Sequence, residues 1–180
     1  MVSIRRATME DLLSMQNTNL WCLPENYQFK YFAYHGILWQ PLLHVAEDSK
    51  GRVVGYVLAK MNDDAQGDEK DKDIKHGHIT SLAVLRTHRN LGLATRLMQA
   101  SQRDQLECFQ AVYCSLHVRK SNKAAFHLYS ETLSYLIHDK EIAYYADGED
   151  AYSMRKWFTK DGQPPADYKM PKKKPLIDAD

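Results

Sequence analysis

The sequence has few cysteines, the residues that form disulfides in proteins of oxidising compartments. It has three cysteines among 180 residues, Cys22, Cys108 and Cys114, and no Cys-x-x-Cys pair. An odd number of cysteines at irregular spacing does not build a disulfide framework. All three lie in apolar runs, so we expect buried free thiols and a reducing compartment.

Long apolar runs and an excess of charge of either sign are missing as well. No stretch approaches the roughly 18 apolar residues of a membrane span, and the opening MVSIRRATMED lacks the apolar core of a secretion signal. The formal net charge of +1 gives no general attraction for polyanions. These absences predict a cytoplasmic protein that binds neither membranes nor, directly, nucleic acid.

Hydrophobic residues make up 44% of the chain, which is enough for the core of one ordinary domain. Alternating or continuous apolar runs predict strands at 2–7, 42–48, 52–61, 76–85, 111–118, 135–145 and 151–158. Helical patterns predict helices at 9–20, 26–37, 92–108 and 121–133. This order predicts a single α/β domain over residues 1–158, with a mixed, twisted β-sheet flanked by helices.

Local signals mark the ends of several elements. Thr8 and Asp11 form a capping box at the first helix, and Ser121 is expected to cap the last. Asp48 to Gly51 reads as the turn of a β-hairpin. The first helix is expected to present one face made of Leu12, Leu13, Gln16 and Leu20.

Two segments fall outside this pattern. Residues 63–75, DDAQGDEKDKDIK, hold six acidic and three basic side chains and are interpreted as a charged surface insertion, with a functional acidic patch as the alternative. Residues 159–180 carry four of the six prolines and are expected to be a disordered tail. Its run Lys172–Lys174 is either a solvated segment or a nuclear address.

The corner RNLGLA, Arg89 to Ala94, joins a strand-like run to a helix-like run. A helix start carries unpaired N–H groups and a positive dipole end, and a glycine there lets a phosphate approach the backbone. Arg89 adds a cation, and Leu91 and Leu93 are expected to point into the protein. The corner therefore suits a pyrophosphate, although a simple turn glycine is the alternative.

The pattern Arg-x-x-Gly-x-Ala resembles the acetyl-coenzyme A loop of the GNAT acetyltransferase superfamily. The resemblance implies acetyl-CoA as cofactor and a pyrophosphate wrapped by the corner. Backbone groups at the end of the preceding strand would stabilise the oxyanion of the reaction. The residues implied in binding the cofactor are Leu82, Ala83, Val84, Arg89, Asn90, Leu91, Gly92, Leu93, Ala94, Thr95, Asn122 and Tyr129.

Asn122, Ala125 and Tyr129 have the spacing of one helix face. That spacing by itself fits a core-facing stripe, which is the reading we keep for Ala125. The GNAT resemblance implies that Asn122 holds the pantetheine arm and that Tyr129 is the acid that meets the leaving thiolate.

Four further motifs resemble one GNAT family more closely, the catalytic subunits of NatA protein N-terminal acetyltransferases. They are CLPENY at Cys22–Tyr27, HGHITSLAV at His76–Val84, SLHVRKSN at Ser115–Asn122 and YYADGEDAY at Tyr144–Tyr152. The resemblance implies direct acetyl transfer, through a tetrahedral intermediate, to the α-amine of nascent polypeptides with small or acidic first residues. The alternatives are a GNAT enzyme that acetylates lysine side chains or a small amine, and a non-catalytic CoA-binding subunit.

Several side chains are candidates for the chemistry. Glu25 is either an exposed helix-start glutamate or, as the resemblance implies, a catalytic residue in the substrate loop. His117 is either a core histidine or the holder of a catalytic water. Tyr145 completes the catalytic set with Tyr129. The residues implied in peptide binding are Leu23, Pro24, Glu25, Tyr27, Tyr144 and Tyr145.

Two other chemistries are poorly supported. His76 and His78 have strand spacing, but no third metal ligand is evident, so no metal is expected. Cys114 and His117 are three residues apart on a strand, which places them on opposite faces and argues against a cysteine nucleophile.

The resemblance also implies partners. NatA catalytic subunits work with a large helical-repeat auxiliary subunit on the ribosome. The run Asn26–Trp39 has more aromatic residues than one helix face can bury. It predicts either an exposed patch that forms an interface or a helix that the sheet and the first helix mostly cover.

Overall fold

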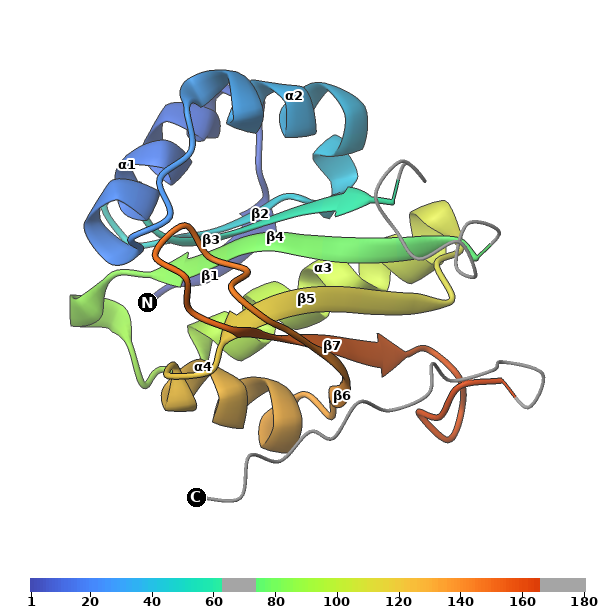
Figure 1. Ribbon diagram of the computed structural model, residues 1–180. Helices are drawn as coiled ribbons and strands as arrows, with labels where there is room; N and C mark the ends of the chain where they lie inside the picture. The colour runs from blue at the N-terminus through green and yellow to red at the C-terminus, as the bar shows by residue number, and fades with distance from the viewer. Residues whose placement is uncertain (63–73, 166–180) are drawn as a thin grey trace. The chain divides into compact units, whose positions relative to one another are not determined.

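A computed structural model describes residues 1–62 and 74–165. The predicted insertion at 63–75 and tail at 159–180 lie largely outside the described residues. The chain divides into two compact units, Met1–Ala111 and Val112–Asp180, which are described in turn (Figure 1). None of the helices in the described part of the chain is both long and apolar enough to cross a membrane.

Four antiparallel strands form the sheet of the first unit. They pair in the order β1 (Ser3–Arg6), β2 (His44–Glu47), β3 (Val53–Met61) and β4 (His76–Val84). The predicted hairpin joins β2 to β3, where the Asp48 N–H donates to the Arg52 carbonyl over 2.9 Å. Gly51 supplies the left-handed residue of this turn, with φ +75°. The four strands predicted in this part of the chain are confirmed.

Helices cover both faces of these strands. A 3₁₀ turn (Met9–Asp11) leads into α1 (Leu12–Cys22), which is followed by α2 (Phe29–Trp39), and α3 (Leu93–Phe109) lies on the other face (Figure 1). Alternation along β3 shows the two layers directly. The Tyr56 ring meets Phe32 of α2, whereas a Cβ on Gly55 would lie 3.4 Å from Leu97 of α3.

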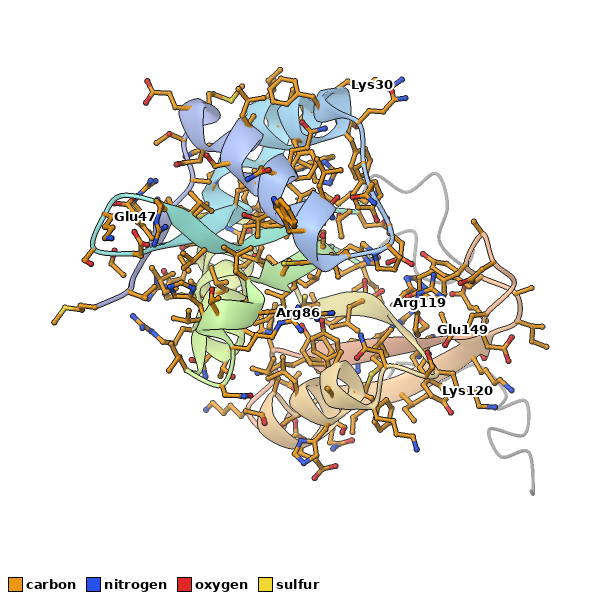
Figure 2. The ribbon with its side chains drawn as sticks, turned by 90° about the vertical axis from the view of Figure 1, so that its left-hand side faces the viewer. Lys30, Glu47, Arg86, Arg119, Lys120 and Glu149 are labelled. Atoms are coloured by element: carbon orange, nitrogen blue, oxygen red, sulfur yellow. The ribbon has the colours of Figure 1, made fainter. Side chains whose placement is uncertain are left out.

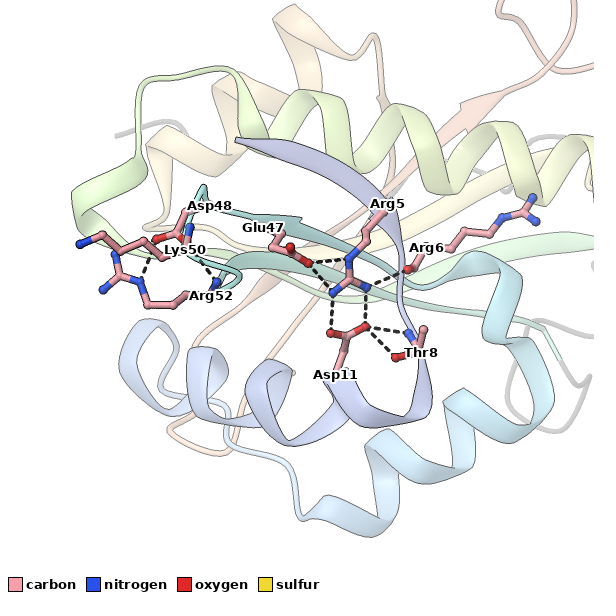
Figure 3. A network of polar contacts seen from close by, with 8 residues as sticks. All are labelled: Arg5, Arg6, Thr8, Asp11, Glu47, Asp48, Lys50 and Arg52. Atoms are coloured by element: carbon pink, nitrogen blue, oxygen red, sulfur yellow. Dashed lines mark hydrogen bonds and ion pairs between the residues drawn. The ribbon is translucent and has the colours of Figure 1, made fainter. Parts of the chain in front are cut away.

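Arg5 fastens β1 to the start of α1. Its guanidinium donates to both oxygens of Asp11, at 2.6 and 2.9 Å, and to Glu47 of β2 at 2.6 Å (Figure 3). Asp11 also accepts from the Thr8 N–H at 2.8 Å, which confirms the predicted capping box. The arginine pairing lowers the pKa of the Asp11 carboxyl, so this junction holds its charge at neutral pH.

The face of α1 that Leu12, Leu13, Gln16 and Leu20 share is not the buried face. Leu13 and Leu20 are exposed, and the buried positions are Leu12, Met15, Thr18 and Asn19. Two polar side chains take inner positions because each finds a partner. The Thr18 hydroxyl donates to the Ser14 carbonyl at 2.9 Å, and Asn19 Nδ2 donates to the Glu25 carbonyl at 3.1 Å.

The expectation of three buried thiols is also wrong. Cys114 is buried, Cys22 is half-buried and Cys108 is exposed, and none of the three forms a disulfide. Cys108 lies in the last turn of α3, where the apolar run predicted from sequence reaches the outer side of the helix.

The second unit has three antiparallel strands and a short helix. β7 (Ala151–Trp157) pairs with β5 (Tyr113–Arg119) on one side and with β6 (Leu136–Glu141) on the other. α4 (Lys123–His127) continues into a π-helical turn (Leu128–Thr132). The three predicted strands and the predicted helix are confirmed.

The predicted cap of this helix is wrong by one residue. Asn122 occupies the N-cap, and its Oδ1 accepts from the Ala125 N–H at 3.1 Å. Ser121 instead donates its backbone N–H to Glu149 Oε1 at 2.8 Å. The loop between β6 and β7 therefore binds Ser121, and Asn122 takes the N-cap position of the helix.

Acidification should weaken the first unit through His35, which is fully buried. Desolvation lowers its pKa from 6.5 to about 4. The unfolded chain therefore binds this proton at a higher pH than the fold does, so stability is full above pH 6.5 and is lost as the pH falls toward 4. At pH 5 the loss through this residue is about 2 kcal/mol relative to pH 7.5. Urea unfolding of the wild type and His35→Gln should show a steeper acid loss in the wild type, and equal slopes would contradict the assignment.

Candidate functional site

The corner RNLGLA forms a turn that leads directly into α3. Gly92 is the N-cap, with φ +71°, and Asn90 is also left-handed, with φ +62°. A Cβ built on Gly92 meets no atom within 4 Å. Glycine is therefore favoured here by the backbone conformation, and it leaves the approach to the helix start open.

The start of α3 presents backbone donors. The first bond within the helix runs from the Arg96 N–H to the Gly92 carbonyl at 3.1 Å, so the N–H groups of Leu93, Ala94 and Thr95 have no acceptor in the helix. Gly92, the N-cap residue, has no side chain that could accept from these N–H groups. Arg89 Nε donates to the Val84 carbonyl at 3.0 Å, which ties the corner to the end of β4 and keeps its positive charge there. These features fit a pyrophosphate group.

The two leucines of the corner behave differently. Leu93 is buried, as expected, whereas Leu91 is 60% exposed, so the prediction that it points into the protein is wrong. Leu91 lies between two left-handed residues, Asn90 and Gly92, and this backbone turns its side chain outward.

The end of β4 holds the residues predicted to lie near the reacting carbonyl. Leu82, Ala83 and Val84 pair with Val57, Tyr56 and Gly55 of β3. Just before them the register shifts, because Leu58 pairs with Ser81 and Ala59 with Ile79. Thr80 is therefore the extra residue of a β-bulge.

The loop between α1 and α2 is anchored by side chains of α1. Asn19 Nδ2 donates to the Glu25 carbonyl, and Gln16 Nε2 donates to the Tyr27 carbonyl at 3.2 Å. Leu23 and Glu25 are half-buried, and Pro24 between them is exposed. Two side-chain amides of α1 thus hold the loop at two of its backbone carbonyls.

Tyr27 leads from this loop into an aromatic stack. Its ring stacks on Tyr31 with 4.7 Å between centroids and meets Phe32 edge-on at 6.5 Å. The Tyr27 side chain is half-buried and gives this loop an apolar surface.

In the second unit, His117 is bonded through both ring nitrogens. Nε2 lies 2.8 Å from Glu141 Oε1, and Nδ1 lies 3.3 Å from the Tyr144 hydroxyl. Because a carboxylate only accepts, Nε2 carries the proton, and in neutral His117 the Tyr144 hydroxyl donates to Nδ1. The Tyr144 and His117 rings also stack at 4.3 Å. Hydrogen bonding to His117 lowers the pKa of the Glu141 carboxyl.

Tyr145 is fixed by a residue that sequence reasoning missed, Arg119. The guanidinium lies 4.0 Å from the centre of the Tyr145 ring and pairs with Asp147 at 2.8 Å and Glu149 at 2.7 Å. Figure 2 shows Arg119 beside Glu149. These contacts hold the loop between β6 and β7, and the bonds from Ser121 and Arg119 lower the pKa of Glu149 to about 2. The motif SLHVRKSN contains Arg119, but only structure shows what it holds.

Asn122 and Tyr129 do not share one regular helix face. Asn122 is exposed at the N-cap, whereas the Tyr129 ring is buried. Asn122 lies outside α4 as its N-cap, and Tyr129 lies in the π-helical turn, in which the Leu133 N–H reaches back to Leu128 at 3.0 Å. Burial raises the pKa of the Tyr129 phenol, so it stays protonated and can donate a hydrogen bond.

Metal chemistry has no counterpart in residues 1–62 and 74–165, where no three His, Cys, Asp or Glu side chains group to hold an ion. His76 Nδ1 lies 2.8 Å from the Ile74 carbonyl. Cys114 is buried with its Sγ 3.2 Å from the Tyr135 hydroxyl.

Comparison with known proteins places this geometry in a family. The model of the acetyltransferase (GNAT) family matches residues 8–135, which include the corner, the β4 bulge and Tyr129. The chain belongs to the GNAT acetyltransferase family. The predicted α/β fold and the predicted family are therefore confirmed for this GNAT protein.

Two relatives show which members of the GNAT family this chain is similar to. The GNAT chain is 64% identical over 156 residues to the catalytic subunit of the N-terminal acetyltransferase A complex of Arabidopsis thaliana, covering 87% of this chain and 78% of the relative. It is 58% identical to the corresponding subunit of Schizosaccharomyces pombe, covering 88% and 86%. It is a homologue of these catalytic subunits.

Solved structures agree with this family. The NatB acetyltransferase complex bound to CoA and MES contains a chain that matches with TM-score 0.71 and 30% identity, covering 86% of this GNAT chain and 98% of that one. A Chaetomium thermophilum acetyltransferase in complex with a bisubstrate analogue matches with TM-score 0.74 and 26% identity, covering 86% of each chain.

Proposed function

We propose that this GNAT protein is the catalytic subunit of an N-terminal acetyltransferase of the A type. It moves the acetyl group of acetyl-CoA to the α-amine of polypeptides. The observation that carries the proposal is the 64% identity to a catalytic subunit of that complex over 87% of the chain. The open corner at Gly92, with backbone donors behind it, supports acetyl-CoA as the acyl donor.

The chemistry asks little of a base. An α-amino group has a pKa of about 7.7–8.0, so roughly a tenth is already neutral near pH 7. Glu25, held by its anchored loop, accepts the proton that the amine loses on attack. Backbone N–H groups of Leu82–Val84 stabilise the oxyanion, and the protonated Tyr129 hydroxyl donates to the departing sulfur.

In this proposal two groups of residues bind the peptide. Leu23, Pro24 and Tyr27 line the approach to Glu25, and Tyr144 and Tyr145 contact the peptide backbone. His117 and Arg119 hold these two tyrosines in place. Asn122 holds the pantetheine arm from the start of α4.

A GNAT enzyme for lysine or small amines is the first alternative. Lysine has a pKa of about 10.4, so its acetylation needs a stronger base. Thiol release from acetyl-CoA should be followed with peptides that have a free N-terminus and with peptides blocked at the α-amine but carrying lysine. Equal rates for the two sets would overturn the α-amine assignment.

A non-catalytic CoA-binding subunit is the second alternative. Calorimetry should detect acetyl-CoA binding, and the thiol assay should show release that depends on peptide. Binding without peptide-dependent release would favour the binding subunit over the enzyme.

The proposal also includes a partner and a location. The protein binds a large helical-repeat auxiliary subunit and works on the ribosome in the cytoplasm. Support comes from apolar side chains that α1 and α2 leave exposed. Trp21 is 75% exposed and Ile37 71%, and further exposed members are Leu13, Leu20, Tyr34 and Leu38. Exposed apolar side chains gathered on two successive helices, α1 and α2, are what a protein interface would cover. The aromatic run Asn26–Trp39 thus divides between core residues such as Phe32 and this surface.

Docking of that subunit should change which peptides are acetylated. The loop with Glu25 joins α1 to α2, so a partner on these helices shifts the peptide entrance. We expect the isolated chain to prefer Asp- and Glu-starting peptides and the complex to prefer Ser- and Ala-starting ones. Rates for these four peptides with and without the auxiliary subunit test this. Identical preferences would contradict the coupling but not the acetyltransferase assignment.

A further inference from the structure

His35 of α2 is a buried histidine that the reaction described above does not use. Its side chain has no exposed surface, and both ring nitrogens are bonded. Nδ1 lies 2.8 Å from the Tyr31 carbonyl, and Nε2 lies 3.1 Å from Thr80 Oγ1. A carbonyl only accepts, so Nδ1 carries the proton, and neutral His35 accepts at Nε2 from the Thr80 hydroxyl.

The threonine at the other end of this bond is the bulge residue of β4. Thr80 turns to His35, and the next residue, Ser81, meets the Tyr56 hydroxyl at 2.6 Å. The Tyr56 ring contacts Phe32 of α2. Consecutive side chains of a regular strand face opposite ways, whereas here both face the layer of α2 because of the bulge.

Helix α2 thus holds Thr80 directly through His35, and it reaches Ser81 only through Tyr56 of β3. The bulge fixes the register of Leu82–Val84 against β3, and so determines which N–H groups of that stretch pair with β3 and which point away from it. An extra strand residue forfeits regular ladder bonding, so a side chain that ties it down has a direct effect on the backbone that follows.

Thr80 is also connected to the peptide side of the first unit. The Tyr31 ring meets the His35 ring edge-on with 4.5 Å between centroids and stacks on Tyr27. Through His35, the Thr80 hydroxyl is therefore linked to the aromatic side chains that follow the Glu25 loop.

We propose that His35 and Thr80 are positioning residues for acetyl transfer, which hold the β4 bulge and through it the backbone donors of Leu82–Val84. The inference rests on the proposed function, since it concerns the same reaction. Neither side chain touches the reacting atoms in this account. Their loss should therefore lower turnover while substrate affinity changes little.

Thr80→Val tests the link, because it removes the hydroxyl and keeps the size and branching of the side chain. With the full chain, acetyl-CoA and a free N-terminal peptide, we expect kcat to fall about tenfold and both KM values to stay within threefold. Thr80→Ser restores the hydroxyl and should restore kcat to within twofold of the wild type.

Thr18→Val is the matched control. Thr18 is a buried threonine whose hydroxyl bonds only within α1, to Ser14. Thermal unfolding should show a similar loss of stability for both valine variants, but only Thr80→Val should lose turnover. A normal kcat for Thr80→Val, an equal loss for Thr18→Val, or no rescue by Thr80→Ser would each overturn the proposal.

If Thr80→Val does not fold, the comparison is made from His35. Gln at this position retains an acceptor for the Thr80 hydroxyl, and Leu does not. We expect His35→Leu to lose about tenfold in kcat and His35→Gln less than threefold, and equal values would overturn the link. An inactive wild type would contradict the proposed function, whereas an active wild type with unaffected variants contradicts only this inference.

Discussion

Glu25→Gln is expected to lower kcat about a hundredfold, the low end of what a general base contributes. The substitution keeps the shape of the side chain and the loop's backbone bonds from Asn19, and it removes the proton acceptor. The affinity for acetyl-CoA should stay within twofold, because the cofactor corner lies at the start of α3. Steady-state rates and calorimetry on the same preparation measure both quantities.

Glu10→Gln is the control for this substitution. Glu10 is an exposed glutamate in the 3₁₀ turn before α1, and its loss should leave kcat unchanged. If Glu25→Gln turns over like the wild type at every pH, Glu25 is not the proton acceptor of the reaction. His117 and Tyr145 then become the first candidates for the base.

Gly92→Asp is expected to weaken acetyl-CoA binding by at least tenfold, or about 1.4 kcal/mol. The new carboxylate lies at the N-terminus of α3, where the backbone donors are aimed, and repels a pyrophosphate. The site is open, and aspartate tolerates the left-handed backbone better than most residues, so the fold should survive.

Gly51→Asp controls for backbone strain. Gly51 has φ +75° in the β2–β3 hairpin, and a Cβ there also meets no atom within 4 Å. Calorimetry should give wild-type acetyl-CoA affinity for this variant and similar thermal stability for the two. Unchanged affinity for Gly92→Asp would remove the corner from the cofactor site.

Sequence periodicity was sufficient for the elements because their signals are local. The strands around His76–Val84 and Tyr113–Arg119 are continuous apolar runs, and the Thr8–Asp11 box marks the first helix within four residues. The glycine of the corner was found in the same way, since a left-handed residue before a helix has few alternatives to glycine.

The features that shape the site were not predictable in this way. No residue type predicts the bulge at Thr80, because the bulge arises from one extra residue in β4 relative to the paired stretch of β3. The π-helical turn that contains Tyr129 likewise has no sequence signal. Asn19 and Arg119 are polar residues whose roles depend on their partners, Glu25 six residues along the chain and Glu149 thirty residues along it, so hydropathy alone does not single them out.

The most direct test of the central claim is where the acetyl group goes. The protein should be incubated with acetyl-CoA and a peptide that carries both a free α-amine and an internal lysine, and the product fragmented in a mass spectrometer. We predict one added acetyl group, on the N-terminal residue, with one equivalent of free thiol released. Acetyl found on the lysine side chain, or thiol release without peptide acetylation, would contradict the account.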